Sequence, residues 1–190
     1  MQIGLFFGSF NPVHTGHLII SNHILNETRL NKIWFVVSPL NPFKINSDLL
    51  DENTRLSLVN VAVRGDGRLL ASDIEFQLPR PSFTVNTLWF LKKNYSGHDF
   101  VIIMGSDNFR DLDKWKNYED IRENFKILIY LRPGFEVQNK FDADIQVLNA
   151  PILDISSTQI RKLIEEGKSI RYLVPEMVRK EIEEKGYYKK

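Results

Sequence analysis

Six apolar runs of strand length recur along the chain, and they constrain its fold more than any other feature. They cover residues 3–7, 33–37, 69–76, 100–104, 126–131 and 145–149. Between them lie segments with apolar residues at helical spacing, at 17–29, 54–64 and 84–94. Strands that are apolar on both faces and alternate with helices are typical of a parallel sheet covered by helices on both sides. The sequence therefore predicts an α/β fold.

The last part of the chain, from about 156 to 190, is predicted to be helical. One helix pattern ends at Gly167, and the next has Pro175 near its start and Gly186 just past its end. The chain contains no repeat, low-complexity tract or linker long enough to divide it. We therefore expect residues 1–190 to form a single domain with a helical C-terminal part. The tryptophans at 34 and 89 lie inside apolar patterns and are expected in the core.

Composition excludes several classes of function. The 190 residues carry a formal charge of +1, which gives no general attraction to nucleic acid or to an anionic membrane. The absence of cysteine excludes disulfides, thiolate zinc sites and cysteine nucleophiles. The first residues have no basic region, and their apolar run is too short to span a membrane. We expect a cytoplasmic protein without nucleic-acid or membrane partners, and the sequence leaves a homo-oligomer open.

The stretch "GSFNPVHTGH" at 8–17 joins the first strand to a helix pattern that starts near Thr15. In open α/β sheets, ligands bind at the carboxyl ends of strands, and the unpaired N–H groups of a helix start suit phosphate. Gly8 and Gly16 would let the backbone approach a ligand closely. The segment is neither a Walker A loop nor a dinucleotide fingerprint, and a zinc site lacks a third ligand beside His14 and His17. The pattern alone leaves phosphate binding and an ordinary helix start both open.

A second helix start, "SSTQIR" at 156–161, has the residues of a capping box in Ser156 and Gln159. Capping does not account for Arg161. In a helix that begins here, Ser157 and Arg161 are four residues apart on one face. A hydroxyl, backbone N–H groups and a guanidinium would then converge, and the planar guanidinium suits phosphate oxygens. Two such helix starts together would suit a polyphosphate.

Together these segments carry a resemblance to the bacterial nicotinate-nucleotide adenylyltransferases of the nucleotidyltransferase superfamily. The matching segments are "HTGH" (14–17), "RPSFTVNTL" (80–88), "FVIIMGSDNFRDLDKW" (100–115), "YLRPG" (130–134), "SSTQIR" (156–161) and 170–188. The resemblance implies a Rossmann-like nucleotidyltransferase fold. It also implies transfer of AMP from ATP to nicotinate mononucleotide, which gives deamido-NAD and pyrophosphate in NAD biosynthesis. Mg²⁺ would arrive with ATP and have no dedicated protein ligands.

The resemblance also implies roles for residues at the matching positions. The residues expected at the triphosphate are Gly8, Ser9, Phe10, His14 and His17 on one side and Ser156, Ser157, Thr158 and Arg161 on the other. Gly105 and Asp107 would lie by the adenosine, and Lys44 would close over the phosphate from its loop. The nicotinate ring would stack on Trp115, with its carboxylate held by backbone N–H groups near Thr84 and Lys116. The expected catalytic residues are His14, His17, Lys44 and Arg161.

The chemistry agrees with the absence of an obvious general base. The nucleophile would be a phosphate-monoester oxygen, whose second pKa is about 6, so it is already ionised at neutral pH. Catalysis then consists of aligning two anions and stabilising charge on the transferred phosphate. We therefore assign His14 and His17 to charge stabilisation and positioning. Arg55 could contact phosphate or only the helix surface, and it is not assigned to the site.

The chain departs from the common family pattern at a few positions. Phe7 replaces the first glycine of the usual Gly-Gly pair, Asn11 replaces an aspartate, and Phe43 replaces a histidine. Lys116 stands where many relatives have an aromatic residue. Rival functions are the same transfer to nicotinamide mononucleotide or phosphopantetheine, and a nucleotide-binding regulator without turnover.

Overall fold

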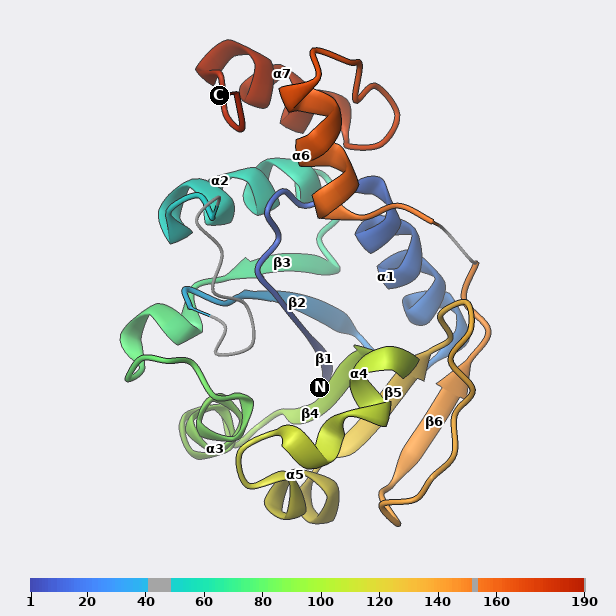
Figure 1. The fold of residues 1–190 in the computed structure, drawn as a ribbon. Helices are drawn as coiled ribbons and strands as arrows, with labels where there is room; N and C mark the ends of the chain where they lie inside the picture. The colour runs from blue at the N-terminus through green and yellow to red at the C-terminus, as the bar shows by residue number, and fades with distance from the viewer. Residues whose placement is uncertain (41–48, 152–153, 190) are drawn as a thin grey trace.

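The computed structural model describes residues 1–40, 49–151 and 154–189. Six parallel strands form one sheet in the order β3-β2-β1-β4-β5-β6 (Figure 1). The strands are β1 (Gln2–Gly8), β2 (Lys32–Val37), β3 (Leu69–Ser72), β4 (Asp99–Gly105), β5 (Lys126–Tyr130) and β6 (Ile145–Leu148). All six predicted strands are present, and the predicted Rossmann-like parallel sheet is confirmed.

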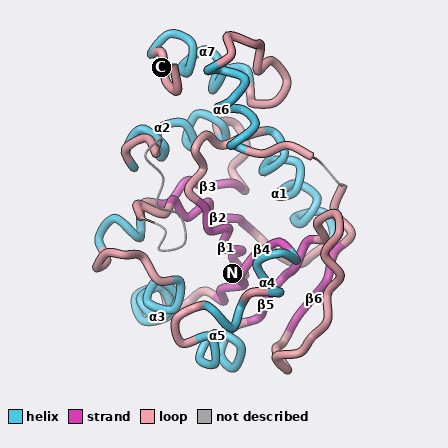
Figure 2. The backbone as a smooth tube through the Cα atoms, viewed as in Figure 1, coloured by secondary structure: helices cyan, strands magenta, loops and turns pink. Residues whose placement is uncertain are grey.

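Helices cover both faces of the sheet, as the tube in Figure 2 shows. The helices are α1 (Thr15–Glu27), α2 (Glu52–Val63), α3 (Thr84–Asn94), α4 (Ser106–Arg110), α5 (Tyr118–Asn124), α6 (Ser157–Glu165) and α7 (Glu176–Lys185), with short 3-10 turns η1 (Ile74–Gln77) and η2 (Leu112–Lys114). Buried residues of α1, α2, α6 and α7 belong to one apolar cluster, and those of α3, α4 and α5 belong to another.

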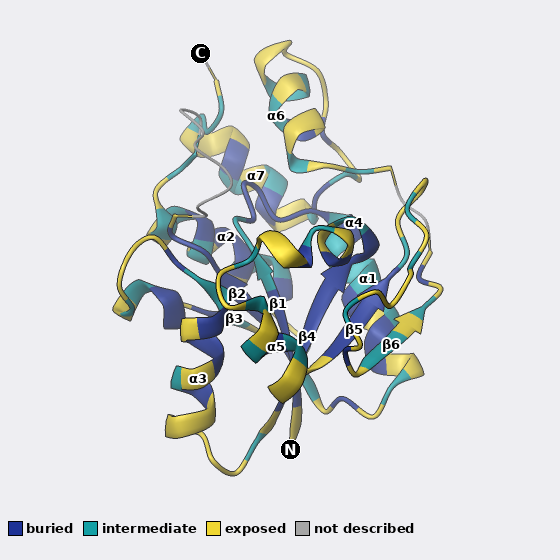
Figure 3. Cartoon of the chain, turned by 60° about the horizontal axis from the view of Figure 1, so that its bottom comes forward, coloured by how far each residue is buried: buried dark blue, intermediate teal, exposed yellow. Residues whose placement is uncertain are grey.

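Alternation along the central strands explains these two clusters. In β4, Val101 and Ile103 face one cluster while Ile102 and Met104 face the other. Because both faces are buried, the strands read as continuous apolar runs. Figure 3 shows the result, with buried central strands and exposed outer helix faces. The helical C-terminal part packs back on this core through Val178 and Ile182 of α7.

Two expectations need correction. The run 69–76 was expected to be one strand, but β3 ends at Ser72 and η1 follows. There the backbone N–H of Ile74 donates to the Ser72 hydroxyl (3.4 Å) and that of Phe76 to the Asp73 carbonyl (2.8 Å), so local bonds replace the strand ladder. Trp89 was expected in the core but is 41% exposed. Its ring packs edge-on against Phe125 at the surface and has the Lys92 Nζ 5.0 Å from its centroid.

The chain order places a ligand-binding edge at the middle of the sheet. From β1 the chain adds β2 and β3 on one side, and it then returns to place β4, β5 and β6 on the other. The reversal falls between β1 and β4, which end at Gly8 and Gly105. Ligands of open α/β sheets bind at such a reversal, outside the carboxyl ends of the strands.

Candidate active site

Two cavities of about 350 and 340 Å³ open at this edge of the sheet. The first is lined by the loop after β1 and by the start of α6, and the second by the start of α3 and the segment 108–116. Both cavities are lined by Phe7, Gly8, Ser9, Asn108 and Trp115. Two ligands bound in these cavities would therefore meet at the turn that follows β1.

The two histidines of the first cavity form a stacked pair. Their ring centroids are 3.7 Å apart, and the backbone N–H of His14 donates to Nδ1 of His17 (3.2 Å). Because this Nδ1 accepts a hydrogen bond, the neutral ring of His17 carries its proton on Nε2. His17 is thus oriented as a donor at its other nitrogen, which suits a phosphate oxygen.

His14 is held in its neutral form. It is 7% exposed, and its Nδ1 is buried without a hydrogen-bond partner in the described part of the chain. Burial, with a smaller contribution from the positive charge of Arg132, lowers the pKa of His14 to about 4. At neutral pH the ring can therefore act on a ligand as a hydrogen-bond donor rather than as a cation.

Gly8 leaves room for the ring of Phe10, and Gly16 leaves room for the ring of His14. A Cβ at Gly8 would lie 2.9 Å from a ring carbon of Phe10, and a Cβ at Gly16 would lie 3.0 Å from His14 Nδ1. Phe10 has a φ of 47° and packs edge-on against His17, with centroids 5.1 Å apart. Phe10 thus lines the cavity but is also a core residue that supports the histidine. Its role includes positioning His17.

The start of α6 completes the first cavity and is bonded to the loop after β1. The Ser157 hydroxyl donates to the Pro12 carbonyl (2.9 Å), and an Arg161 N–H donates to the Asn11 carbonyl (2.8 Å). Ser156 caps the helix by accepting from the backbone N–H of Gln159 (3.2 Å), as its position predicted. Residues of the two sequence motifs therefore line one cavity.

The side chain of Asn11 links the loop after β1 to the segment before α2 and to the C-terminal segment. Its Oδ1 accepts from the Leu50 backbone N–H (3.3 Å) and from the Tyr188 hydroxyl (2.9 Å). Burial raises the pKa of Tyr188, so its phenol keeps the proton that it donates. Both contacts need only an acceptor oxygen, which an asparagine supplies as well as an aspartate. This departure from the family pattern therefore preserves the local contacts.

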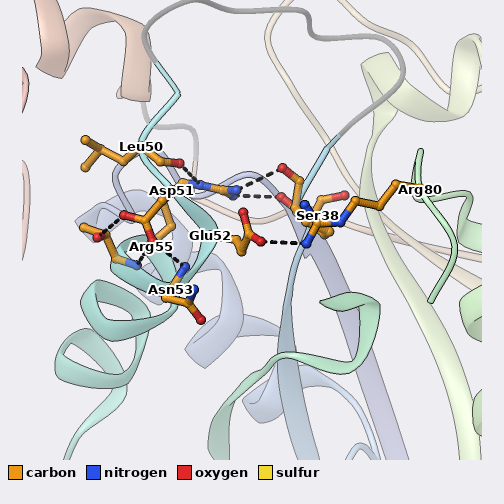
Figure 4. Close-up of polar contacts among 9 residues, drawn as sticks. Ser38, Leu50, Asp51, Glu52, Asn53, Arg55 and Arg80 are labelled. Atoms are coloured by element: carbon orange, nitrogen blue, oxygen red, sulfur yellow. Dashed lines mark hydrogen bonds and ion pairs between the residues drawn. The ribbon is translucent and has the colours of Figure 1, made fainter. Parts of the chain in front are cut away.

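Arg55 has a structural role that the sequence did not predict (Figure 4). It is fully buried on α2, a helix that begins where Asp51 Oδ1 accepts from the backbone N–H groups of Asn53 and Thr54 (3.0 Å each). Its guanidinium donates to four backbone carbonyls, those of Ser9 (2.7 Å), Ser38 (2.8 Å), Pro39 (3.1 Å) and Leu50 (2.7 Å). Arg55 thus fixes the turn shared by the two cavities to both flanks of the segment 40–49. It does not line either cavity.

The second cavity is lined by the three residues predicted at the nicotinate ring and its carboxylate, Thr84, Trp115 and Lys116. Thr84 is the first residue of α3, whose N-cap Phe83 makes no capping hydrogen bond with its side chain. Glu75 also lines this cavity, is 1% exposed and accepts from two hydroxyls. Burial raises the pKa of Glu75, and the hydroxyls oppose that shift in part.

Gly105 and Asp107 do not line either cavity, although a Cβ at Gly105 would collide with Asp107 Oδ1. Arg132 lies 3.4 Å from that carboxylate and does line the first cavity. Sequence reasoning assigned no role to Arg132 or to Asn108, although both stand in segments that carried the resemblance. Lys44 and Phe43 lie outside the described residues.

The described residues contain no group of three His, Cys, Asp or Glu side chains that could hold a metal ion. Nor does that part of the chain include a helix long and apolar enough to cross a membrane. The charge of the first cavity instead comes from arginine side chains and two helix starts, a combination that suits a nucleotide polyphosphate.

Comparison with known proteins agrees with this geometry. A family model described as cytidylyltransferase-like matches residues 5–163. The solved nicotinic acid mononucleotide adenylyltransferase of Plasmodium falciparum complexed with NaAD superposes with a TM-score of 0.83 at 20% identity, covering 98% of this chain and 97% of that one. A solved putative nicotinate-nucleotide adenylyltransferase of Vibrio parahaemolyticus gives 0.72 at 22% identity, covering 95% and 97%. The fold and site thus define a cytidylyltransferase-like nucleotidyltransferase.

Sequence relatives narrow this class. A probable nicotinate-nucleotide adenylyltransferase of Flavobacterium johnsoniae is 49% identical over 193 residues, covering 100% of both chains. One of Christiangramia forsetii is 50% identical and covers 99% of this chain and 98% of its own. The chain belongs to the nicotinate-nucleotide adenylyltransferase family.

Proposed function

We propose that this chain transfers the adenylyl group of Mg-ATP to nicotinate mononucleotide, with deamido-NAD and pyrophosphate as products. The observation that carries the proposal is the pair of cavities that meet at Gly8 and Ser9. The cavity between the two helix starts suits a triphosphate, and the cavity beside Trp115 suits a flat ring. A phosphate at their common boundary can approach the α-phosphate of ATP.

In the proposed reaction, a 5′-phosphate oxygen of the acceptor forms the new bond to the α-phosphorus. The bond from that phosphorus to the bridging oxygen of the β-phosphate breaks, and pyrophosphate leaves with that electron pair. No proton has to be removed from the nucleophile. His17 and Arg161 stabilise the charge of the triphosphate, and His14 donates a hydrogen bond in its neutral form. Lys44 is proposed to contact the phosphates.

The test is to incubate the purified protein with ATP, Mg²⁺ and one acceptor at a time, and to measure pyrophosphate release. The acceptors are nicotinate mononucleotide, nicotinamide mononucleotide and phosphopantetheine. We expect release with the pyridine nucleotides. Release only with phosphopantetheine would overturn the acceptor assignment, and no release with any of them would favour a nucleotide-binding regulator.

Site variants test the assigned roles. We expect His17→Ala and Arg161→Ala each to lower kcat by at least about 10²-fold, the effect of losing one transition-state donor. His23→Ala is the matched control, because His23 is on α1 but does not line either cavity. Near-normal turnover in either site variant would remove that residue from the catalytic set.

A further inference from the structure

The residues after α7 reach back to the loop that lines the first cavity. Gly186, with a φ of 67°, ends the helix in the left-handed region, and the backbone N–H of Tyr187 donates to the Ile182 carbonyl (3.0 Å). After this turn the ring of Tyr188 packs against the same apolar cluster as α7. Its hydroxyl donates to Asn11 Oδ1 (2.9 Å). The C-terminal part therefore contacts the loop after β1 directly.

Asn11 connects this hydroxyl to the predicted catalytic arginine. Asn11 is 4% exposed and lines the first cavity. Its side chain accepts from Tyr188, and its backbone carbonyl accepts from an Arg161 N–H (2.8 Å). The contact of the same guanidinium with the Thr158 hydroxyl is longer, at 3.4 Å. The Asn11 carbonyl is thus the better acceptor of the two, and the position of Asn11 fixes the position of the guanidinium.

The hydroxyl of Tyr188 is suited to this role because it keeps its proton. Burial raises the pKa of Tyr188, and the positive charges of Arg161 and Arg55 oppose that shift only in part. A neutral phenol has a single O–H to donate, and Asn11 Oδ1 accepts it. The Leu50 backbone N–H donates to the same oxygen at 3.3 Å. Tyr188 therefore supplies the shorter of these two bonds to the Asn11 side chain.

The C-terminal part also holds the other end of this loop. The backbone N–H of Thr15 donates to the Leu173 carbonyl (2.9 Å), and the Thr15 hydroxyl donates to the Tyr172 carbonyl (3.2 Å). None of these three residues lines the first cavity. Tyr188 differs from them, because it bonds to a residue that lines the cavity and that also holds Arg161.

We propose that Tyr188 is a positioning residue for adenylyl transfer, which holds the Arg161 guanidinium at the triphosphate by fixing Asn11. This inference rests on the proposed function. Tyr188 itself lines neither cavity. Loss of its hydroxyl leaves Arg161 with its full charge but with a backbone acceptor that is held less firmly. Because catalysis here consists of aligning anions with fixed charges, a misplaced guanidinium lowers the rate of the chemical step.

The test is a double-mutant cycle of Tyr188→Phe and Arg161→Ala. We measure kcat by pyrophosphate release at saturating Mg-ATP and nicotinate mononucleotide, and urea midpoints establish that each variant is folded under the assay conditions. Tyr188→Phe removes one oxygen and keeps the ring. We expect it to lower kcat about tenfold in the wild-type background, with the KM for nicotinate mononucleotide changed less than about twofold.

The second background separates positioning from general support of the fold. In Arg161→Ala, we expect Tyr188→Phe to change kcat less than about twofold, because the group that Tyr188 positions is absent. A tyrosine that only stabilised the fold would lower kcat by the same factor in both backgrounds.

Tyr187→Phe is the matched control. Tyr187 is adjacent in sequence and packs against the same apolar cluster, but its hydroxyl makes no hydrogen bond within the part of the chain that the structure describes. It also lines neither cavity. We therefore expect the kcat of Tyr187→Phe to equal that of the wild type.

The possible failures are distinguishable. A wild type that releases no pyrophosphate with either pyridine nucleotide would refute the proposed function, and the role of Tyr188 with it. An active wild type whose kcat is unchanged by Tyr188→Phe would overturn the role of Tyr188 alone. An equal loss of kcat in the two backgrounds, or an equal loss in Tyr187→Phe, would indicate a structural tyrosine and would also overturn that role.

Discussion

The buried His14 makes the stability of this protein depend on pH in a defined window. In the unfolded chain its pKa is about 6.5, and in the folded protein burial and the charge of Arg132 lower it to about 4. Between these values the unfolded state binds a proton that the folded state does not. Stability therefore falls as pH decreases from about 6.5 to about 4. Replacement by asparagine removes this proton and keeps a residue suited to the N-cap of α1.

The size of the effect follows from the two pKa values. Each pKa unit corresponds to about 1.4 kcal/mol, so the difference between 6.5 and about 4 corresponds to about 3 kcal/mol of stability. At pH 5 His14 is almost fully protonated in the unfolded state but still mostly neutral in the folded protein. About 2 kcal/mol of the free energy of unfolding has therefore been lost at that pH. This loss is a large fraction of the total stability of a typical domain.

The assay is urea unfolding of the wild type and of His14→Asn at several pH values between 7 and 5. Other titrating groups are present in both proteins and cancel in the difference. We expect the free energy of unfolding of the wild type to fall relative to the variant by about 2 kcal/mol between pH 7 and pH 5. Two curves that stay parallel would refute a buried, neutral His14.

Three other substitutions test how the site is held. Gly16→Ala places a Cβ 3.0 Å from His14 Nδ1. We therefore expect a lower kcat and a free energy of unfolding in urea that is lower by about 1 kcal/mol. An unchanged kcat would show that His14 can shift freely. A lysine at position 55 cannot donate hydrogen bonds to all four buried carbonyls that Arg55 contacts. We therefore expect Arg55→Lys to lower the free energy of unfolding by about 3 kcal/mol. A urea midpoint equal to that of the wild type would contradict this expectation. Trp115→Ala is expected to raise the KM for the pyridine nucleotide more than the KM for ATP in steady-state kinetics, and equal changes would indicate a structural tryptophan.

The sheet could be predicted because its evidence is local. The central strands are apolar on both faces, and the helix patterns at 17–29, 54–64 and 84–94 separate the first four runs, so the alternation indicated a parallel sheet. The error at β3 has the same origin. Ile74 and Phe76 continue the apolar run, but the bond between the Ile74 N–H and the Ser72 hydroxyl ends the strand, and periodicity does not report such a bond.

The residues of the candidate site were predictable where they stand in a motif and line a cavity, and not where they contact backbone carbonyls alone. Arg161 stands in a helix-start pattern that suits phosphate, and it lines the first cavity as expected. Arg55 is also an arginine at a helix start, yet its guanidinium contacts only backbone carbonyls. A carbonyl acceptor carries no residue identity, so the sequence contains no signal for the partners of Arg55. Of the two, only Arg161 could be assigned from its motif.

The same kind of contact explains how the loop after β1 can change sequence and keep its shape. Three side chains hold this loop by its carbonyl oxygens. Arg55 bonds to Ser9, Arg161 to Asn11, and Ser157 to Pro12. None of these bonds depends on the side chain of the residue that accepts it, so an asparagine in place of an aspartate removes no backbone contact.

Phe7 is the harder departure, because its side chain lines both cavities where the two substrates would meet. It is half-buried and packs on the apolar cluster beneath the second cavity, so part of its ring is taken up by the core. The carbonyl of the next residue, Gly8, accepts from the Ser38 backbone N–H (2.9 Å), which fixes where the turn begins. The ring can therefore narrow the boundary between the cavities without moving the turn. We therefore expect Phe7 to change the shape of both cavities at their common boundary while the turn keeps its position.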